Sequence, residues 1–171
     1  SQVEHSIFGW NSYLADHRAK GKDNVFASQQ TVAKGLSDAR YAFLFWNLQP
    51  DQALVIETNI PDFLPLLRAD ERACHQIILN LLSNSIKFTP PGGRISLKSG
   101  VVSEGGLWFS VSDSGIGIPA DEISRVIEPF TQVDGSLSRK NKGTGLGLSL
   151  VHSLCTLHGA ALQIESEVGN G

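Results

Sequence analysis

The chain has 171 residues, 41% of them hydrophobic, a length and composition that suit one globular domain with a real core. Its formal net charge of −3 at pH 7 lacks the basic excess of nucleic-acid-binding domains, so no nucleic acid is expected as a partner. No apolar run reaches the roughly 18 residues of a membrane span, and no leader pattern opens the sequence. Two cysteines, Cys74 and Cys155, lie in apolar helical patterns and are expected to be buried thiols in a reducing environment.

The first 22 residues give only a weak signal. A few apolar residues have helical spacing, and the polar stretch RAKGKDN that follows them is typical of a linker. We therefore treat residues 1–22 as an uncertain helical segment or linker, possibly the tail of a longer helix, and expect one domain over residues 23–171. The apolar residues at helical spacing are Ile7, Trp10 and Leu14.

A helix and a strand are expected next. Residues 28–47 carry apolar side chains three and four positions apart, which predicts an amphipathic helix that ends before Pro50. The apolar stretch 53–58 then predicts a strand. Prolines at positions 61 and 65 argue against a long element directly after it.

The central part of the chain has the strongest pattern. Asp70 is a suitable N-cap for a helix that runs to about Phe88 and that the sequence PPGG ends. Two strands are expected next, residues 94–102 and 107–113, joined by the turn-like SEGG. They are expected to form an antiparallel hairpin.

The last part of the chain alternates loop, helix and strand. A short helix is expected from Pro119, and residues 128–144 predict a long loop, which is usually functional inside a compact domain. A helix over residues 146–158 should end at Gly159, before a final strand over residues 160–167. Helices and strands alternate but include a hairpin, so we predict an α/β fold, a two-layer sandwich of a mixed sheet with helices on one face.

Three polar residues form a stripe on the predicted helix 70–88. Asn80, Asn84 and Lys87 are four and three positions apart, so they lie on one side, separate from the apolar face. A solvated helix face is one explanation of the stripe. The other is a ligand site, because amide oxygens suit Mg²⁺ and a lysine amine can offset phosphate charge.

Asp113 ends a predicted strand and is followed by glycines at positions 115 and 117. A strand-to-helix turn with Pro119 at the first helical position would explain this pattern without a ligand. The alternative is the floor of a base-binding site, because a carboxylate accepts a hydrogen bond from an exocyclic amine and glycines let a flat ring approach the backbone. Such a site would favour adenine over guanine.

Gly143, Gly145 and Gly147 alternate at the start of the last predicted helix, although a glycine costs a helix about 1 kcal/mol relative to alanine. Neither the dinucleotide fingerprint nor the P-loop template fits this spacing. Exposed N–H groups at a helix N-terminus carry partial positive charge and bind anionic oxygens. A bound phosphate would therefore compensate for the glycines.

Taken in chain order, four segments resemble the boxes of the sensor histidine kinase catalytic domain. NLLSNSIKFTPPGG resembles the N box, DSGIGIP the first glycine box, EPF the F box and GTGLGLSLV the second glycine box. This family belongs to the GHKL ATPases, together with the DNA gyrase B subunit, MutL-type repair proteins and heat-shock chaperones. The resemblance covers residues 25–171 and implies the GHKL ATP-binding fold, with ATP and Mg²⁺ as cofactors.

The resemblance also implies roles for individual residues. Asn80 and Asn84 would hold Mg²⁺ and phosphate oxygens, and Asn80 and Lys87 would serve catalysis at the phosphates. Asp113 would accept the adenine amino group, and Phe130 would pack at the root of an ATP lid. The other residues expected to bind the nucleotide are Gly115, Gly117, Ile118, Lys142, Gly143, Thr144, Gly145, Leu146, Gly147 and Leu148.

None of the five histidines has the sequence context of a phosphoacceptor histidine in this family. The resemblance therefore implies a catalytic module that passes the γ-phosphoryl group of ATP to a histidine of a dimerisation domain outside this sequence, and that is inactive in transfer alone. A response regulator receiver domain would be the further partner. The module is expected to be cytoplasmic and monomeric, in a homodimeric bacterial parent with or without an inner-membrane anchor. The sequence stops where the family usually has one more strand, so that last strand is expected to be missing.

Two other functions stay open. A GHKL ATPase of the gyrase, MutL or chaperone type would hydrolyse ATP with a glutamate one helical turn before Asn84, where this sequence has Asn80. A pseudo-kinase module would act through protein contacts alone.

Overall fold

The computed structural model describes residues 7–9, 26–27, 53–61, 64, 67–101, 106–131 and 144–171. The strands in these ranges are β1 (Ile7–Gly9), β2 (Phe26–Ala27), β3 (Val55–Asn59), β4 (Leu67–Arg68), β5 (Arg94–Val101), β6 (Leu107–Asp113) and β7 (Ala161–Gln163), and the helices are α3 (Glu71–Phe88) and α4 (Gly147–Leu157). The predicted helix 28–47 and most of the predicted loop 128–144 lie outside the described residues.

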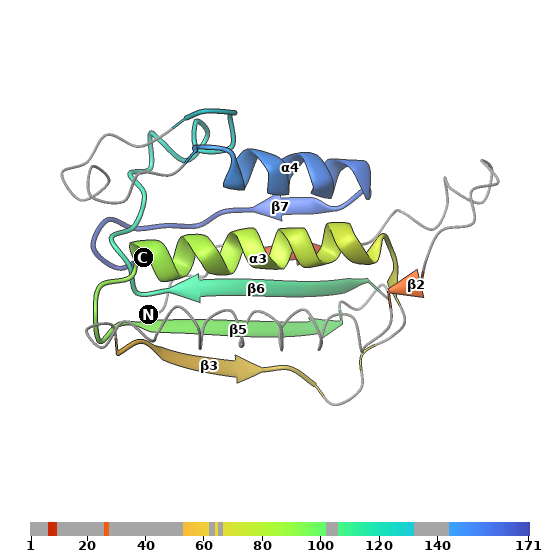
Figure 1. Ribbon diagram of the computed structural model, residues 1–171, viewed down its shortest axis with the longest axis horizontal. Coiled ribbons are helices and arrows are strands. Elements are labelled where there is room, and N and C mark those ends of the chain that lie inside the picture. The colour runs from red at the N-terminus through yellow and green to blue at the C-terminus, as the bar shows by residue number, and fades with distance from the viewer. Residues whose placement is uncertain are drawn as a thin grey trace.

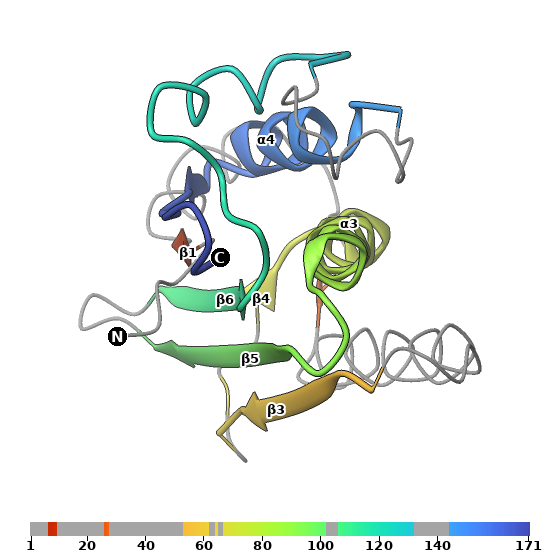
Figure 2. The same ribbon diagram turned by 90° about the vertical axis from the view of Figure 1, so that its left-hand side faces the viewer.

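A five-stranded sheet organises these elements, with α3 and α4 on the same side of it (Figures 1 and 2). Its strand order is β3-β5-β6-β1-β7, while β2 and β4 form a separate two-stranded sheet. Strand β3 runs parallel to β5, and the other neighbouring pairs of the large sheet are antiparallel. The predicted two-layer α/β class with a mixed sheet is confirmed.

Helix α3 begins and ends as its sequence predicts. The Asp70 carboxylate accepts hydrogen bonds from the main-chain N–H groups of Arg72 and Ala73, at 2.8 and 3.3 Å, and so caps the helix. At the other end, the N–H of Thr89 donates to the carbonyl oxygen of Ser85, and Pro90 follows. The C-terminal end of α3 is therefore fixed beside the start of β5.

The core lies between the sheet and the two helices. Alternate residues of β5 and β6 face the helices, as the two-residue period of a strand requires. Its buried members include Ile77, Ile78 and Leu81 of α3, Ile95 and Leu97 of β5, Phe109 and Val111 of β6, and Val151 of α4. Each such side chain stabilises the fold by about 1.5–3 kcal/mol. Apolar packing thus fixes both helices relative to the sheet.

The two cysteines belong to the same core, Cys74 on α3 and Cys155 on α4. Both are free and buried, which confirms the prediction of buried thiols. Burial in apolar surroundings raises the pKa of each thiol from 9.0 to about 12.

Helices α3 and α4 pack in opposite directions (Figure 1). The N–H of Asp70, at the start of α3, donates to Nε2 of His158, at the end of α4, over 3.3 Å. His158 is buried, and its Nδ1 donates to the carbonyl oxygen of Leu154 at 2.8 Å. These two bonds use both ring nitrogens and hold that end of the helix pair, so the end of α3 lies near the start of α4.

Two predicted elements near the C-terminal half differ in the structure. No helix starts at Pro119: residues 120–129 form successive turns, mostly closed by hydrogen bonds between residues three apart, and only Val126 is buried. The final strand is three residues long, not eight, because the chain after Gln163 leaves the sheet and bonds to the turn that follows β6.

The helical spacing in the first segment gave a wrong prediction for Ile7–Gly9. These residues form β1, which pairs antiparallel with β6 on one side and β7 on the other. Hydrogen bonding to two strands outweighs the helical spacing of three apolar residues, of which Trp10 and Leu14 lie outside the described residues.

Candidate functional site

The C-terminal end of α3, the N-terminal end of α4 and the chain after β6 gather at one end of the molecule (Figure 1). Nearly all the residues that the sequence singled out lie on these three segments. Lys142 and Gly143 are outside the described residues.

The two asparagines of α3 face the first residue of α4. A Cβ atom added to Gly147 would lie 3.4 Å from Asn84 Nδ2 and 3.5 Å from the Oδ1 atoms of both Asn80 and Asn84. Asn80 donates from Nδ2 to the carbonyl oxygen of Gln76 at 2.7 Å, which leaves its Oδ1 as the acceptor on the side of α4. Both side chains are half-buried. The two asparagines of the predicted stripe therefore lie at the boundary between the two helices.

The N-terminus of α4 has no capping side chain. Its N-cap residue is Leu146, whose side chain cannot accept a hydrogen bond, and its first turn holds no acidic residue. The first intrahelical bond of this helix is donated by Leu150 N–H to the carbonyl oxygen of Leu146. The N–H groups of the first turn can therefore bind an anionic oxygen beside Asn80 and Asn84.

Lys87 lies in the last turn of α3, on the same side as the two asparagines. Its Nζ is 4.8 Å from the centroid of the Phe88 ring, a cation–π contact. Partial burial lowers the pKa of the Lys87 amine from its ordinary value of 10.5. An anion beside this amine would offset the cost of keeping it charged.

Asp113 ends β6 and begins a tight turn that is fastened to α3. Its Oδ1 accepts a hydrogen bond from Gly115 N–H at 2.9 Å, and Ile116 N–H donates to the carbonyl oxygen of Phe88 at 3.2 Å. A Cβ atom at Gly115 would lie only 2.6 Å from Asp113 Oδ1 and 2.7 Å from Phe88 O. Only glycine fits at this position, so the turn is held close to the end of α3.

The next two residues of the turn contact the end of the chain. Gly117 has a φ of +70°, and a Cβ atom there would lie 2.0 Å from the carbonyl oxygen of Glu167. Ile118 N–H donates to Ser166 Oγ at 2.7 Å. Ser166 and Glu167 were not predicted as site residues, because both fall in the predicted strand 160–167. The nearby Gly169 and Gly171 disfavour a continuing strand and were the signal for a loop.

Phe130 and Gly145 form the third contact of this region. Phe130 N–H donates to the carbonyl oxygen of Gly145 at 3.0 Å, and both residues have a positive φ, +63° and +69°. The Phe130 side chain is 76% exposed. The two ends of the segment between these residues therefore meet at one point.

The other predicted residues around the start of α4 differ in their burial. Thr144 and Leu146 flank Gly145, and both side chains are exposed, that of Leu146 to 38%. Leu148 is half-buried and its side chain packs against the apolar core.

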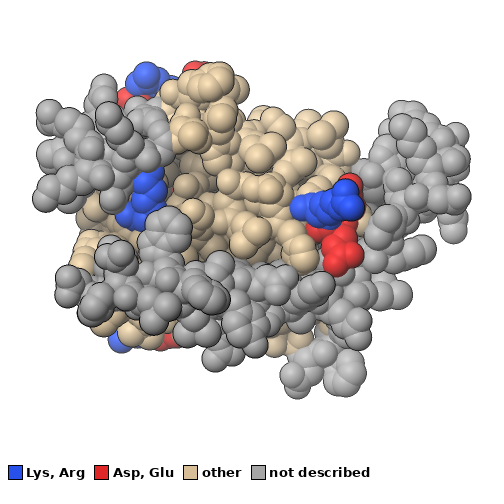
Figure 3. Space-filling view, viewed as in Figure 1, with Lys and Arg blue, Asp and Glu red and all other residues tan. Residues whose placement is uncertain are grey.

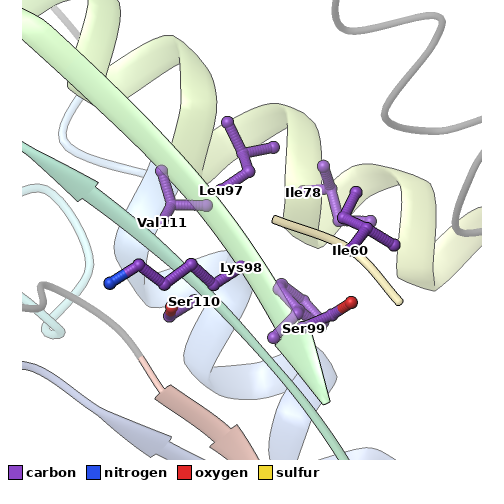
Figure 4. Close-up of a pocket in the computed structure, with 8 residues that line it drawn as sticks. Ile60, Ile78, Leu97, Lys98, Ser99, Ser110 and Val111 are labelled. Atoms are coloured by element: carbon purple, nitrogen blue, oxygen red, sulfur yellow. The ribbon is translucent and has the colours of Figure 1, made fainter. Parts of the chain in front are cut away.

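A small cavity between the sheet and α3 is separate from these residues (Figure 4). Its free volume is about 10 Å³, which is at the lower limit for one water molecule. It is lined by Ile60, Ile78, Leu97, Lys98, Ser99, Phe109, Ser110 and Val111.

In the view of Figure 3 the described surface is largely uncharged. On this face, individual groups rather than an extended charged patch would attract an anion.

A family profile described as "Histidine kinase-, DNA gyrase B-, and HSP90-like ATPase" matches residues 69–171, which include both helices and the turn after β6. The chain belongs to this ATPase family. The expected resemblance to the GHKL ATPases is thereby confirmed.

Two similar proteins are histidine kinases. DivJ of Caulobacter vibrioides is 45% identical over 152 residues, which are 86% of this chain and 25% of DivJ. The circadian input-output histidine kinase CikA of Synechococcus elongatus is 44% identical over 119 residues, 69% of this chain and 16% of CikA. The chain thus spans a quarter or less of these two relatives.

Solved structures agree with these relatives. Full-length ShkA, in a complex with AMPPNP, matches 93% of this chain and 32% of its own length, with a TM-score of 0.70 and 28% identity. The mycobacterial sensor histidine kinase MprB shares the fold, with a TM-score of 0.62 over 80% of each chain at 24% identity. The chain is therefore a histidine-kinase-type ATP-binding catalytic domain. No helix in the described ranges is long and apolar enough to cross a membrane.

The two glycines of this ATPase domain that flank Leu146 should respond differently to alanine. At Gly145 the positive φ, together with backbone atoms of Phe130 and Thr131 only 2.9 Å from a Cβ, leaves no room for a side chain. At Gly147 a Cβ makes only ordinary contacts, and alanine is the better helix former. We expect Gly145→Ala to lower the free energy of unfolding by about 1–2 kcal/mol and Gly147→Ala to leave it unchanged or raise it. Urea unfolding of both variants measures this, and an equal loss in the two would contradict it.

Proposed function

We propose that this chain is the ATP-binding catalytic module of a two-component sensor histidine kinase. In this proposal Mg·ATP binds at the junction of α3, α4 and the turn after β6, and its γ-phosphoryl group passes to a histidine of the dimerisation domain in the parent protein. The observation that carries the proposal is the contact of Asn80 and Asn84 with Gly147, at the uncapped N-terminus of α4. It brings amide oxygens and main-chain N–H groups to one place, as a bound polyphosphate requires.

Asp113 suits the adenine end of this site. A carboxylate can accept several hydrogen bonds, so Asp113 can bind Gly115 N–H and an exocyclic amine at the same time. Gly115 and Gly117 let the turn pack directly against Phe88 and Glu167, so the turn is held beside Asp113 as a fixed backbone surface for the base. Ile118 follows at the edge of the same turn.

The residues at the other end fit Mg²⁺. Among the described residues no group of three or more His, Cys, Asp or Glu side chains could hold a metal, so protein ligands there would be the amide oxygens of Asn80 and Asn84. Mg²⁺ accepts such a small ligand set because it keeps several waters and takes phosphate oxygens as further ligands. When bound, it would supply neutralisation of the phosphate charge.

The protein's own contribution would be positioning and charge. Lys87, next to Asn84 by one helical turn, would bind phosphate oxygens with an amine that is already partly desolvated. The first-turn N–H groups of α4 would orient the triphosphate, with Thr144, Gly145 and Leu146 at the junction with the lid. Orientation and electrostatic stabilisation supply most of the catalysis in phosphoryl transfer.

The partners follow from this role. The phosphoacceptor histidine, the dimerisation domain and the response regulator receiver domain would all lie outside this chain, and the parent would act as a homodimer. Phe130 would pack at the root of the ATP lid, with Lys142 and Gly143 in the lid segment.

ATP hydrolysis of the gyrase or chaperone type is less well supported. It needs a carboxylate that activates water one turn before Asn84, and the residue there is Asn80, whose Nδ2 is bonded to Gln76. In a pseudo-kinase role the chain would act through protein contacts, and nucleotide would be absent or only structural.

Calorimetry with ADP and Mg²⁺ tests the site. We expect Asn84→Ala and Asp113→Ala each to weaken binding at least tenfold, about 1.4 kcal/mol, because each removes a ligand from one end of the nucleotide. The exposed residues Asn59 and Asp121 provide the matched controls Asn59→Ala and Asp121→Ala, which should bind as the wild type does. Absence of wild-type binding at millimolar ADP, or unchanged affinity in both folded site variants, would contradict the proposal.

A transfer assay separates the kinase from the ATPase. The chain is mixed with the dimerisation domain of its parent and with ATP labelled in the γ-phosphate. We expect acid-labile label on a histidine of that domain, and none after Asn84→Ala. Release of label only as inorganic phosphate would favour the ATPase.

A further inference from the structure

The loop Ser166–Gly171, which follows β7, lies against the turn Gly115–Ile118 that begins just after Asp113. Gly169 N–H donates to the carbonyl oxygen of Ile116 at 2.8 Å. Gly117 is so close to Glu167 O that no Cβ fits between them. The loop thus meets two successive residues of the turn through backbone atoms.

Ser166 joins the loop to the turn through its side chain. Its Oγ accepts from Ile118 N–H at 2.7 Å and donates to the main-chain oxygen of Gly171 at 3.0 Å. One hydroxyl can do both, because it carries one donor and two acceptor lone pairs. Ser166 therefore ties the far end of the turn to a loop that is itself folded back by the bond to Gly171.

The same loop reaches the other end of the turn. Asn170 lines a small hollow of about 30 Å³ together with Asp113. The other residues that line this hollow are Arg94, Ser96, Ser112 and Ser114. The loop therefore bonds to the turn at Ile118 and also lies near Asp113, on the other side of the turn.

We propose that Ser166 is a positioning residue that sets the adenine end of the nucleotide site by holding Ile118 and, through it, the turn that starts at Asp113. This inference rests on the proposed function, because it assumes that the turn receives the base. The turn contains two glycines, which have more backbone freedom than other residues. Without a bond that holds the turn, this freedom would be lost only when a base binds, and binding would be weaker. A hydrogen bond from outside the turn removes that freedom before binding, and it keeps the Asp113 carboxylate in the orientation that accepts from an adenine amine.

Calorimetry with ADP and with GDP tests this role. Loss of the Ser166 hydroxyl in Ser166→Ala, and with it the bond from Ile118 N–H, should weaken ADP binding about fivefold and lower the preference for ADP over GDP by a similar factor. Ser166→Thr keeps the hydroxyl and should keep both the affinity and the preference. Ser153→Ala removes a hydroxyl that donates to Ser149 O on an exposed part of α4, and it should change neither.

The outcomes are distinct. Wild-type affinity and preference in Ser166→Ala would overturn the inference, as would equal weakening of ADP and GDP, because a general structural defect would not act on the base alone. Loss of the ADP preference in Ser166→Thr would also overturn it. If the wild type bound no ADP, the proposed function itself would fail, which is a separate result.

Discussion

The antiparallel packing of α3 against α4 is the constraint on which the site depends. Apolar side chains hold the two helices on one face of the sheet, and the bond from Asp70 N–H to His158 fixes one end of the pair. The opposite ends then meet, so that Gly147 lies against Asn80 and Asn84. The core beneath these residues thus brings together polar groups that are far apart in the sequence.

The turn after β6 adds the second end of the site. It is fastened to α3 through Phe88 and to the C-terminal loop through Ser166, and its glycines permit both contacts because no Cβ would fit. Asp113 is therefore held at a fixed place relative to the end of α3. Fixed ends suit a ligand that has a base at one end and charged phosphates at the other, because the protein then loses little conformational freedom when the ligand binds.

Local signals in the sequence predicted a large part of this arrangement. The Asp70 cap and the apolar face predict helix α3, and the turn-like SEGG between two expected strands predicts the hairpin. Each signal lies within a short stretch, so the helix and the hairpin are observed close to their predicted bounds. The candidate residues on α3 and in the turn after Asp113 were also found from their spacing. Their mutual placement came only with the structure.

What could not be predicted depends on distant partners. The strand β1 exists because β6 and β7 both bond to it, and residues 164–167 leave the sheet because the loop bonds to Ile116 and Ile118 instead. The sequence pattern also does not distinguish Gly145 from Gly147, because both belong to the same run of alternating glycines. Their different backbone angles and neighbours follow from Phe130 and from the asparagines of α3, which are remote in the chain.

We propose one site with a base end at Asp113 and a phosphate end at the start of α4. Two-dimensional NMR of the labelled chain, titrated first with adenosine and then with ADP and Mg²⁺, tests this claim most directly. Adenosine should shift the amide signals of Gly115 and Ile118, and ADP with Mg²⁺ should in addition shift Gly147 and the side-chain amides of Asn80 and Asn84. Shifts at Gly147 with adenosine alone, or none at Gly147 with ADP and Mg²⁺, would contradict the account.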